Sequence, residues 1–291
     1  MTLHEHTMKQ VRPKKNLGQH FLIDLSIARR IADTVDACPE LPVLEVGPGM
    51  GVMTQFLKDK PRELKVVEID RESVEYLREQ YGWRVDSERW SPSTIHQSPS
   101  LSPQSPVIIA DDFLRMDLSK VFDGRQFVLT GNYPYDISSQ IFFKMIDNKD
   151  LIPCCTGMIQ HEVALRMAAP PGGKQYGILS VLIQAWYDVE YLFTVEPSVF
   201  NPPPKVQSAV IRMTRNATTD LGCDEQLFRR VVKTTFGQRR KMLRVSLRQL
   251  LPQESALFVT HADMLTRRPE QLTIAEFVEL TNLVSDSLIT E

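Results

Sequence analysis

The sequence predicts an α/β protein with a doubly wound, mostly parallel Rossmann-like sheet and a small C-terminal helical domain. Short aliphatic runs that are typical of buried strands alternate with helical segments over the first two thirds of the chain. Past residue 216 no strand-like run follows, and residues 224–287 show the spacing of amphipathic helices. We therefore expect an α/β domain at 1–216 and a helical domain at 217–291.

The expected elements follow from the spacing of apolar residues. Residues 23–35 place Ile27 and Ile31 at helical spacing behind Asp24 or Ser26 as the N-cap, which predicts the first helix. Strands are expected at 42–47, 64–70, 107–111, 126–132, 156–160, 189–196 and 206–215. Further helices are expected after Gly51 and at 71–81, 137–147, 161–169 and 177–187. Alternation of this kind is typical of a parallel sheet.

Residues 83–106 interrupt the alternation. The stretch is rich in Ser, Pro and Gln and poor in aliphatic residues. Such a composition does not support a packed core. We expect a flexible insertion here.

The composition excludes a collagen-like protein, a wholly disordered protein and a small disulfide scaffold. Of 291 residues, 42% are hydrophobic and 24% are charged, which is typical of a globular protein. The four cysteines include no Cys-x-x-Cys pair and the histidines show no metal-ligand spacing, so we expect a reduced protein without a metal. No apolar h-region and no run near the roughly 18 apolar residues of a membrane span is found. We therefore expect a cytoplasmic protein without a membrane partner.

A glycine-rich turn follows the first predicted strand. The segment GPGMG (47–51) places Gly47, Gly49 and Gly51 between that strand and a helix, where backbone can approach a ligand closely. Glu68 ends the next strand, where a carboxylate can accept hydrogen bonds from ribose hydroxyls. Asp112 follows the third strand and would meet an adenine amine. The turn by itself also fits a tight connection that binds no ligand.

The spacing of the glycines favours one adenosine-containing ligand. The pattern is G-x-G-x-G after Glu45, whereas pyrophosphate binders use G-x-G-x-x-G, and no Walker lysine follows. S-adenosyl-L-methionine carries a sulfonium group and no phosphate, so it requires a permissive turn and acceptors for its hydroxyls. We therefore expect S-adenosyl-L-methionine rather than NAD or ATP.

The segment GNYPYDISS lies where the fourth predicted strand ends. An exocyclic adenine nitrogen is a poor nucleophile because its lone pair is delocalised into the ring. The side-chain oxygen of Asn132 and the backbone carbonyl of Tyr133 would accept both amino hydrogens, with Pro134 fixing this backbone. Tyr135 would stack on the base, and Phe200 would face it across the flipped base. The same segments also fit a plain strand-end turn and a core anchor.

Six segments share their order and residue types with one family. They are KKNLGQHFLID (14–24), LEVGPGMG (44–51), VVEID (66–70), DFL (112–114), GNYPYDISSQIFFK (131–144) and FNPPPKVQSAVIRM (200–213). Together they resemble the ribosomal RNA small-subunit adenine dimethyltransferases over nearly the whole chain. The resemblance implies a class I methyltransferase fold and S-adenosyl-L-methionine as donor. It also implies dimethylation of N6 on two adjacent adenosines near the 3′ end of 16S rRNA, in a small ribosomal subunit or its precursor, as a step in ribosome biogenesis.

Carried over position by position, the resemblance implies cofactor contacts at six positions. They are His20, Leu22, Gly47, Glu68, Asp112 and Asn132. Asn132 would also hold the target amine. Tyr133 stands where Leu, Ile or Phe is usual, and Asp136 where Asn is common. For Asp112, the neighbouring Asp111 is an alternative.

Positive charge is concentrated although 34 basic and 36 acidic residues give a net charge of −2. Eight basic side chains follow one another without an intervening acid: Arg229, Arg230, Lys233, Arg239, Arg240, Lys241, Arg244 and Arg248. Lys14 and Lys15 belong to a second cluster. Such clusters favour RNA phosphates, although a charge run is also typical of a solvated helix face.

Three alternatives remain at this point. Large-subunit rRNA methylases of the resistance type share the glycine turn, but the LGQHFL and FNPPPKVQSAV segments argue against them. A non-catalytic assembly factor on the same fold would not need the intact Asn-Tyr-Pro-Tyr segment. DNA adenine methylases share the Asn-x-Pro-Tyr pattern. The sequence is silent on the oligomeric state.

Overall fold

The computed structural model describes Lys14 and residues 20–86 and 106–289. The chain divides into two compact units. The first takes the described residues up to His161 together with Leu192–Arg212, and the second takes Glu162–Tyr191 and the residues from Met213 onward. The expected single boundary near residue 216 is simpler than this discontinuous division, and it stays a prediction.

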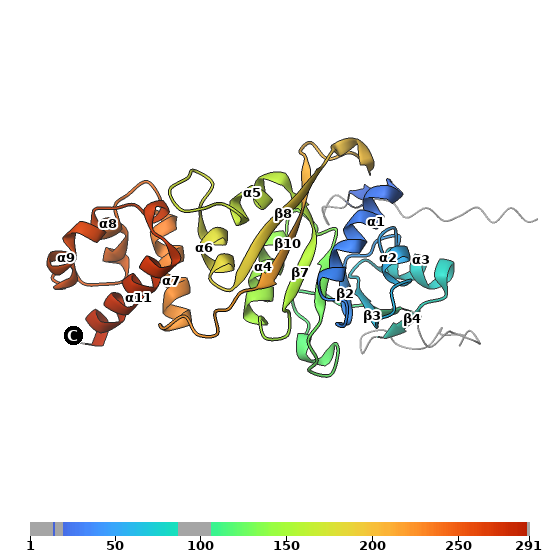
Figure 1. Cartoon of the computed structure of the whole chain (residues 1–291), viewed down its shortest axis with the longest axis horizontal. Coiled ribbons are helices and arrows are strands. Elements are labelled where there is room, and N and C mark those ends of the chain that lie inside the picture. The colour runs from blue at the N-terminus through green and yellow to red at the C-terminus, as the bar shows by residue number, and fades with distance from the viewer. Residues whose placement is uncertain (1–13, 15–19, 87–105, 290–291) are drawn as a thin grey trace, which may run out of the picture. The chain divides into compact units, whose positions relative to one another are not determined.

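The described residues form an eight-stranded sheet with strand order β4-β5-β3-β2-β6-β7-β10-β8. Figure 1 labels β2, β3, β4, β7, β8 and β10 of this sheet. The strands are β2 (Val43–Val46), β3 (Leu64–Val67), β4 (Arg84–Asp86), β5 (Val107–Ile109), β6 (Val128–Gly131), β7 (Cys154–Gln160), β8 (Tyr187–Val195) and β10 (Ser208–Arg215). Strand β2 pairs in parallel with β3 and β6, β5 with β3 and β4, and β6 with β7. The predicted doubly wound, mostly parallel sheet is confirmed.

The central strands are aliphatic runs because both faces of the sheet are buried there. All four residues of β2 and of β6 are buried, as expected for parallel strands inside an α/β protein. Their register pairs Val43 with Val128 and Val46 with Gly131. Both strands therefore end at the same edge, where the glycine turn follows β2 and Asn132 follows β6.

A second sheet joins two segments that lie far apart in the sequence. Strand β1 (Phe21–Leu22) pairs antiparallel with β9 (Phe200–Asn201), with Leu22 opposite Phe200. The sequence predicted neither strand, because two residues are too short a run to show a period. The pairing places His20 beside the segment that follows Phe200.

The predicted helices of the first unit are confirmed. They are α1 (Leu25–Asp33), α2 (Thr54–Leu57), α3 (Arg71–Tyr81) and α4 (Ser138–Asp147). The Asp24 carboxylate caps α1, accepting from the backbone N–H groups of Ser26 and Ile27 at 2.8 and 3.2 Å. Asp70 caps α3, which ends at Gly82 in the left-handed conformation. Single-turn helices lie at Thr34–Ala37, Leu118–Lys120, Pro197–Val199, Leu247–Gln249 and Pro269–Gln271.

The predicted insertion at 83–106 begins too early. Arg84–Asp86 forms the edge strand β4, which pairs with β5. Trp83 is buried, and its ring stacks on Tyr81 with centroids 4.7 Å apart. The buried indole ring of Trp83 thus holds the start of a segment whose average composition is polar. The burial of this large aromatic side chain stabilises the start more than the polar residues around it destabilise it. Residues 87–105 of the predicted insertion lie outside the described residues.

The second unit is built mainly from helices. They are α5 (His161–Met167), α6 (Ile178–Gln184), α7 (Glu225–Gly237), α8 (Leu243–Ser246), α9 (Leu257–Thr260), α10 (Ala262–Leu265) and α11 (Ile274–Ile289). Asp224 caps α7, and Phe236 of α7 stacks on Phe277 of α11 with centroids 5.8 Å apart. The expected C-terminal helical region is confirmed.

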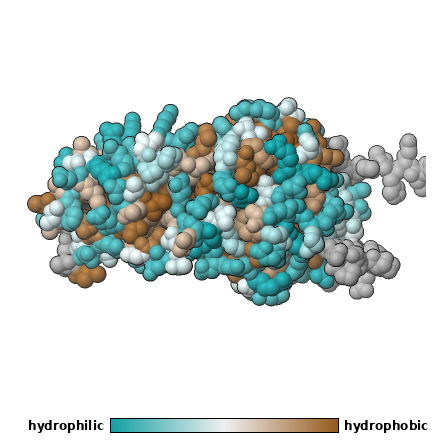
Figure 2. Space-filling view, viewed as in Figure 1, coloured by the Kyte–Doolittle hydropathy of each residue, from teal (hydrophilic) through white to brown (hydrophobic). Residues whose placement is uncertain are grey.

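The visible surface is mixed in character. Hydrophilic residues cover much of the face seen in Figure 2, with apolar residues between them, as on many globular proteins. In the part of the chain that the structure describes, every helix is too short or too polar to cross a membrane.

Candidate active site

A cavity of about 260 Å³ opens where β2, β3 and β6 end. Its walls come from residues 20–22, 45–50, 52–53, 67–69, 111–114 and 132–137, all in the first compact unit. Open α/β sheets bind ligands at this edge. The structure therefore brings the glycine turn, the acidic strand ends and the Asn-Tyr-Pro-Tyr segment into one site.

Gly47 and Gly49 of the glycine turn line the cavity. Gly49 has a φ of 55°, and a Cβ atom there would lie 3.2 Å from the ring of Phe21. Its backbone N–H donates to Glu68 Oε2 at 3.1 Å. The backbone of the turn after β2 is thus joined to the Glu68 side chain at the end of β3, and a larger residue at position 49 would push the turn against Phe21.

Gly51, also predicted to contact the cofactor, does not line the cavity. Its φ is 77°, and a Cβ atom there would lie 3.1 Å from Leu77 and 3.2 Å from Tyr81 of α3. The glycine is therefore needed where the turn packs against α3. A role as a cofactor contact stays a prediction.

Glu68 is a buried acceptor at the end of β3. Its two carboxylate oxygens accept from the backbone N–H groups of Asp70 at 2.8 Å and Gly49 at 3.1 Å. Burial raises the pKa of Glu68 to about 7, and these backbone hydrogen bonds oppose the rise. Each oxygen still has a lone pair, so Glu68 can also accept from the hydroxyls of a bound ribose.

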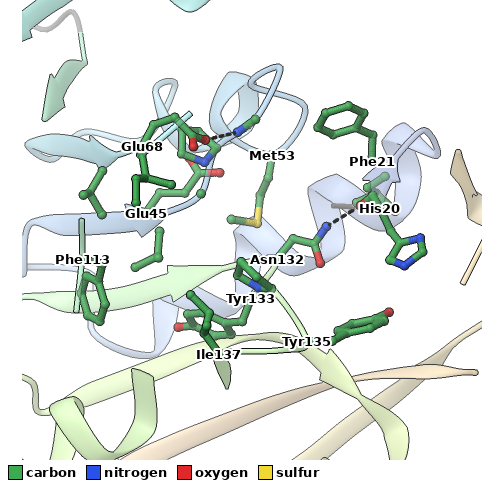
Figure 3. A pocket seen from close by; sticks show the side chains of 18 of the residues that line it. His20, Phe21, Glu45, Met53, Glu68, Phe113, Asn132, Tyr133, Tyr135 and Ile137 are labelled. Carbon is green, nitrogen blue, oxygen red and sulfur yellow. Dashed lines mark hydrogen bonds between the residues drawn. The ribbon is translucent and has the colours of Figure 1, made fainter. Parts of the chain in front are cut away.

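Glu45 lies beside Glu68 in the same wall (Figure 3). Its side chain is buried, and its Oε2 has no hydrogen-bond partner among the described residues. Burial raises the pKa of Glu45 to about 8, and the nearby Glu68 carboxylate adds to the rise. The sequence analysis used Glu45 only to describe the glycine pattern. The sequence signal that could have identified Glu45 is an acidic residue inside an otherwise aliphatic strand.

Asp111 and Asp112 both line the cavity, so each of them stays a candidate for the contact with the adenine amine of the cofactor. Asp112 Oδ1 accepts from the Leu114 N–H at 2.9 Å, which shapes the turn after β5. Lys144 of α4 donates to the carbonyl oxygens of Leu114 and Met116 at 3.1 and 2.5 Å. Helix α4 thereby fixes the loop that carries both aspartates.

The charge of the cavity favours a cationic ligand. Five wall residues are acidic: Glu45, Glu68, Asp111, Asp112 and Asp136. Because burial raises the pKa of Glu45 to about 8 and that of Glu68 to about 7, Glu45 is mostly uncharged and Glu68 partly charged at pH 7. None of the described residues that line the cavity is Lys or Arg. An apolar wall from Ile69, Met53 and Phe113 accompanies them, and Ile69 is 59% exposed. Such a cavity suits a flat apolar ring attached to a positively charged group.

Asn132 extends from the end of β6 with its side chain held in place. Its Nδ2 donates to the backbone carbonyl of His20 at 3.2 Å (Figure 3). The neighbouring Tyr133 N–H donates to the Met158 carbonyl of β7 at 3.0 Å. Because the amide nitrogen is engaged by His20, Oδ1 is left as the acceptor, as the predicted grip on an adenine amine requires.

The Tyr133 side chain packs into β7. Its hydroxyl donates to the Thr156 carbonyl at 2.9 Å and lies 3.2 Å from the Cys155 sulfur. The ring fits because the residue below it is Gly157, where a Cβ atom would lie 2.7 Å from Tyr133 Cε2 and 2.3 Å from the Gly131 oxygen. Gly157 was not predicted as a site residue. The only sequence signal that pointed to Gly157 was its partner Tyr133, a residue type that is unusual at this position in the resembled family.

Tyr135 and Phe200 are placed differently. Tyr135 lines the cavity, and its hydroxyl lies 2.5 Å from the Ser208 hydroxyl of β10. The His20 ring lies against it, with centroids 5.6 Å apart and planes at 31°. Phe200 is 3% exposed and does not line the cavity, because its pairing with Leu22 turns it into the core. The structure does not bring Phe200 to Tyr135 as a second wall.

Lys14 of the N-terminal basic cluster forms ion pairs. Its Nζ lies 2.5 Å from Asp70 Oδ1 and 3.4 Å from Glu72 Oε1. Lys14 thus balances acidic groups beside Glu68. Lys15 lies outside the described residues.

The eight basic residues of the other cluster lie on α7, the turn after it, α8 and the single-turn helix Leu247–Gln249. Six are exposed: Arg230, Lys233, Arg240, Lys241, Arg244 and Arg248. Arg239 is half-buried and donates to the Gly173 carbonyl at 3.0 Å. Contact with RNA stays a prediction for all eight. Among the described residues, no group of His, Cys, Asp and Glu side chains is arranged to hold a metal ion.

Comparison with known proteins finds one family along the chain. The family described as "Ribosomal RNA adenine dimethylase" matches residues 10–286. A "Ribosomal RNA small subunit methyltransferase A" from Bacteroides thetaiotaomicron is 64% identical over 283 residues, covering 97% of this chain and 98% of the relative. The protein of the same name from Flavobacterium johnsoniae is 48% identical over 277 residues, covering 95% and 97%.

Solved structures show the same fold. A dimethyladenosine transferase from Plasmodium falciparum superposes with a TM-score of 0.71 at 22% identity, covering 92% of this chain and 98% of the other. The 23S rRNA methyltransferase ErmE gives a TM-score of 0.62 at 24% identity, covering 91% and 99%. These two similarities identify the fold.

Proposed function

We propose, since this chain belongs to the ribosomal RNA adenine dimethylase family, that it dimethylates N6 of two adjacent adenosines near the 3′ end of small-subunit rRNA. The observation that carries the proposal is the held carboxamide of Asn132, whose remaining acceptor opens into the same cavity as Glu68 and the glycine turn. The relatives at 48–64% identity are all named for the small subunit, which favours it over large-subunit rRNA.

The cavity fits S-adenosyl-L-methionine, the methyl donor of this class of enzyme. When bound, this cofactor supplies an electrophilic methyl carbon on a positively charged sulfur. The wall carries the aspartates Asp111, Asp112 and Asp136 beside the buried Glu68 and Glu45, and none of the described residues that line it is Lys or Arg, which matches that charge. Glu68 would accept from the ribose hydroxyls, and Asp112 from the adenine amine. Glu45 Oε2, which lacks a partner among the described residues, would pair with a further polar group of the ligand.

The residues at the end of β6 would perform the transfer by positioning. Asn132 Oδ1 and the Tyr133 carbonyl would accept the two N6–H groups, which aims the nitrogen lone pair at the methyl carbon. As the nitrogen–carbon bond forms, the electrons of the carbon–sulfur bond pass to sulfur. The nitrogen then loses one proton to solvent. No basic side chain is needed. A second round on the same nitrogen gives the dimethylated product, and in that round only one N–H remains for Asn132 Oδ1 or the Tyr133 carbonyl to accept.

RNA contact is proposed for the basic cluster of α7 and the turns after it. Arg240, Lys241, Arg244 and Arg248 are exposed, and within the described part of the chain none of them forms an ion pair. Such side chains bind phosphates without reading sequence. We propose that they hold a small ribosomal subunit or its precursor in the cytoplasm.

The test is methylation of small ribosomal subunits whose adenosines are unmodified. The purified protein is incubated with these particles and methyl-labelled S-adenosyl-L-methionine, and the labelled nucleosides are mapped. We expect N6,N6-dimethyladenosine at two adjacent positions near the 3′ end of 16S rRNA. Label on free 23S rRNA, or only on duplex DNA, would contradict the proposal, as would RNA binding without any methyl transfer.

A further inference from the structure

We propose that Lys144 of α4 is a positioning residue that makes the cavity select adenine in its cofactor. The inference rests on the proposed function, in which Asp112 or its neighbour Asp111 accepts from the adenine amine. It adds the side chain that holds these two aspartates in place from behind. The sequence analysis did not single out Lys144.

The two aspartates belong to a short turn, residues 111–116, which follows β5. The Asp112 carbonyl accepts from the backbone N–H of Met116 at 3.0 Å, so the segment makes one helical turn. The last carbonyl oxygens of such a turn have no backbone partner within it. Lys144 Nζ donates to two carbonyl oxygens of this turn, those of Leu114 and Met116, at 3.1 and 2.5 Å. One ammonium group therefore closes the turn and ties it to α4.

The same ammonium group lies behind the cavity wall that the turn supplies. Its Nζ is 5.6 Å from the centroid of the Phe113 ring, within the range of a cation–π contact. Phe113 is 5% exposed and lines the cavity (Figure 3), whereas Lys144 does not line it. Lys144 therefore acts on the cofactor only through the turn.

Acidic side chains surround the Lys144 ammonium group. Burial lowers the pKa of Lys144, and the carboxylates of Asp112, Asp117, Asp111 and Asp147 oppose this effect. Two of these carboxylates, those of Asp111 and Asp112, are the candidates for the adenine contact. The ammonium group attracts both of them, which limits the orientations in which they can accept from an amine.

Helix α4 supports Lys144 because the helix is fixed at its start and along one face. Ser138, its first residue, donates from Oγ to the Tyr135 carbonyl at 3.2 Å. Ile141 and Phe142 of the same helix are fully buried. The Lys144 side chain thus extends from a fixed element, and the turn takes its position from that element.

A fixed turn matters most for the edge of the base. Adenine presents an amine that donates to a carboxylate, whereas hypoxanthine presents a carbonyl oxygen that only accepts. A carboxylate held in place penalises the second base, because two acceptors then face each other without a proton between them. A carboxylate that can swing away loses this preference. Lys144 therefore raises the preference for adenine more than the affinity for nucleosides in general.

The experiment measures the binding of two compounds to variants of the full chain by calorimetry, without RNA. One compound is S-adenosylhomocysteine, the product that the cofactor leaves after methyl transfer. The other is S-inosylhomocysteine, in which a carbonyl oxygen replaces the adenine amine. Lys144→Met removes the donors and the charge, Lys144→Gln keeps a donor without the charge, and Lys144→Arg keeps both. Lys120→Met, at an exposed position of the single-turn helix Leu118–Lys120, is the matched control.

We expect Lys144→Met to bind S-adenosylhomocysteine about 5-fold to 30-fold more weakly, because a misplaced acceptor loses much of one hydrogen bond to a charged group. Its affinity for S-inosylhomocysteine should change by less than about 3-fold, so the preference for adenine falls. Lys144→Gln should lie between Lys144→Met and the wild type. Lys144→Arg should recover most of the preference, and Lys120→Met should keep it. A merely structural role would weaken the binding of both compounds alike and leave their ratio unchanged.

A second set of variants tests the route through the aspartates. Asp111→Asn and Asp112→Asn are each combined with Lys144→Met, and the aspartate whose replacement lowers the preference is assigned the adenine contact. In that background, Lys144→Met should change the preference by less than about 2-fold, because the two effects share one contact.

Three results would overturn the inference. They are an equal effect of Lys144→Met and Lys144→Gln on both compounds, no effect on either compound, and a full effect that persists when the aspartates are replaced. Because these measurements use no RNA, they stand apart from the proposed function. A wild-type protein that prefers S-adenosylhomocysteine but methylates no small ribosomal subunit would refute that function and leave the role of Lys144 in place.

Discussion

The two ends of the cavity are built in different ways. At the cofactor end, Gly49 and Glu68 are joined by backbone donors across 19 positions of sequence. At the target end, Asn132 is held by a residue 112 positions away and Tyr135 by one 73 positions away. The cofactor end thus depends on one turn between neighbouring strands. The target end depends on side chains that meet only in the folded sheet. Substitutions should therefore separate cofactor binding from methyl transfer.

The largest expected effect is at the target end. Asn132→Ala removes the acceptor for the target amine, and we expect methylation to fall about 100-fold to 1000-fold, as for other groups that orient a reacting atom. Cofactor affinity should change by less than about 5-fold. Single-turnover rates and calorimetry measure the two quantities. Asn148→Ala, at the end of α4 where the amide donates to the Lys144 carbonyl, is the matched control. An equal loss of cofactor affinity and of methylation rate would contradict the view that the two ends of the cavity act separately.

The packing of the target end is tested at Gly157. Gly157→Ala places a Cβ atom 2.3 Å from the Gly131 oxygen at a φ of 144°, so backbone must shift. We expect the free energy of unfolding to fall by about 3 kcal/mol, from overpacking plus backbone strain. Denaturant unfolding measures the change. Gly237→Ala, with nothing within 4 Å and in helix α7, is the control and should leave the free energy of unfolding unchanged or raise it by up to about 1 kcal/mol. A variant as stable as the control would contradict this account of the Tyr133 ring.

The cofactor end is tested at Glu68. Glu68→Gln removes one of the acceptor oxygens and leaves the Gly49 or Asp70 N–H without its partner, so we expect cofactor affinity at pH 8 to fall about 10-fold to 100-fold. Glu72→Gln, on the exposed start of α3, should bind the cofactor as the wild type does.

The same site should show a pH dependence. Burial raises the pKa of Glu68 to about 7, so lowering the pH from 8 to 6 protonates the carboxylate and removes an acceptor. Cofactor affinity of the wild type should therefore fall as the pH is lowered. Ribose hydroxyls favour the ionised form, so binding near pH 7 should release a proton. Calorimetry in two buffers of different ionisation enthalpy measures this release. If the Glu68→Gln variant showed the same change of cofactor affinity between pH 8 and pH 6, another group would be responsible for that change.

The smallest expected effect concerns the basic cluster. Arg244→Ala with Arg248→Ala removes two exposed charges, and we expect affinity for small ribosomal subunits to fall about 3-fold to 10-fold. The slope of log affinity against log salt should fall by about 0.7 to 0.9 per lost phosphate contact. Arg125→Ala, whose side chain pairs with Glu63 in the first unit, is the control. An unchanged salt slope would show that the cluster is only a solvated surface.

The sequence anticipated most of the cofactor end and part of the target end. Gly47, Gly49, Glu68 and Asn132 lie in the cavity as expected, because each ends a strand and parallel strands end at one edge. Gly51 faces α3 instead, since consecutive residues of a tight turn point in different directions. The prediction that the flexible insertion starts at residue 83 was wrong, because Trp83 packs against Tyr81. Average composition does not reveal this contact.

By itself, the sequence determined the kind of fold, the family and the strand ends that carry the site. These follow from local patterns, since the strand period, the glycine spacing and the capping residues act over a few positions of the chain. Only the tertiary structure decided which side chains meet: His20 with Asn132 and Tyr135, Tyr135 with Ser208, and Tyr133 with Gly157. Such contacts depend on register and packing between distant segments, which no local pattern encodes.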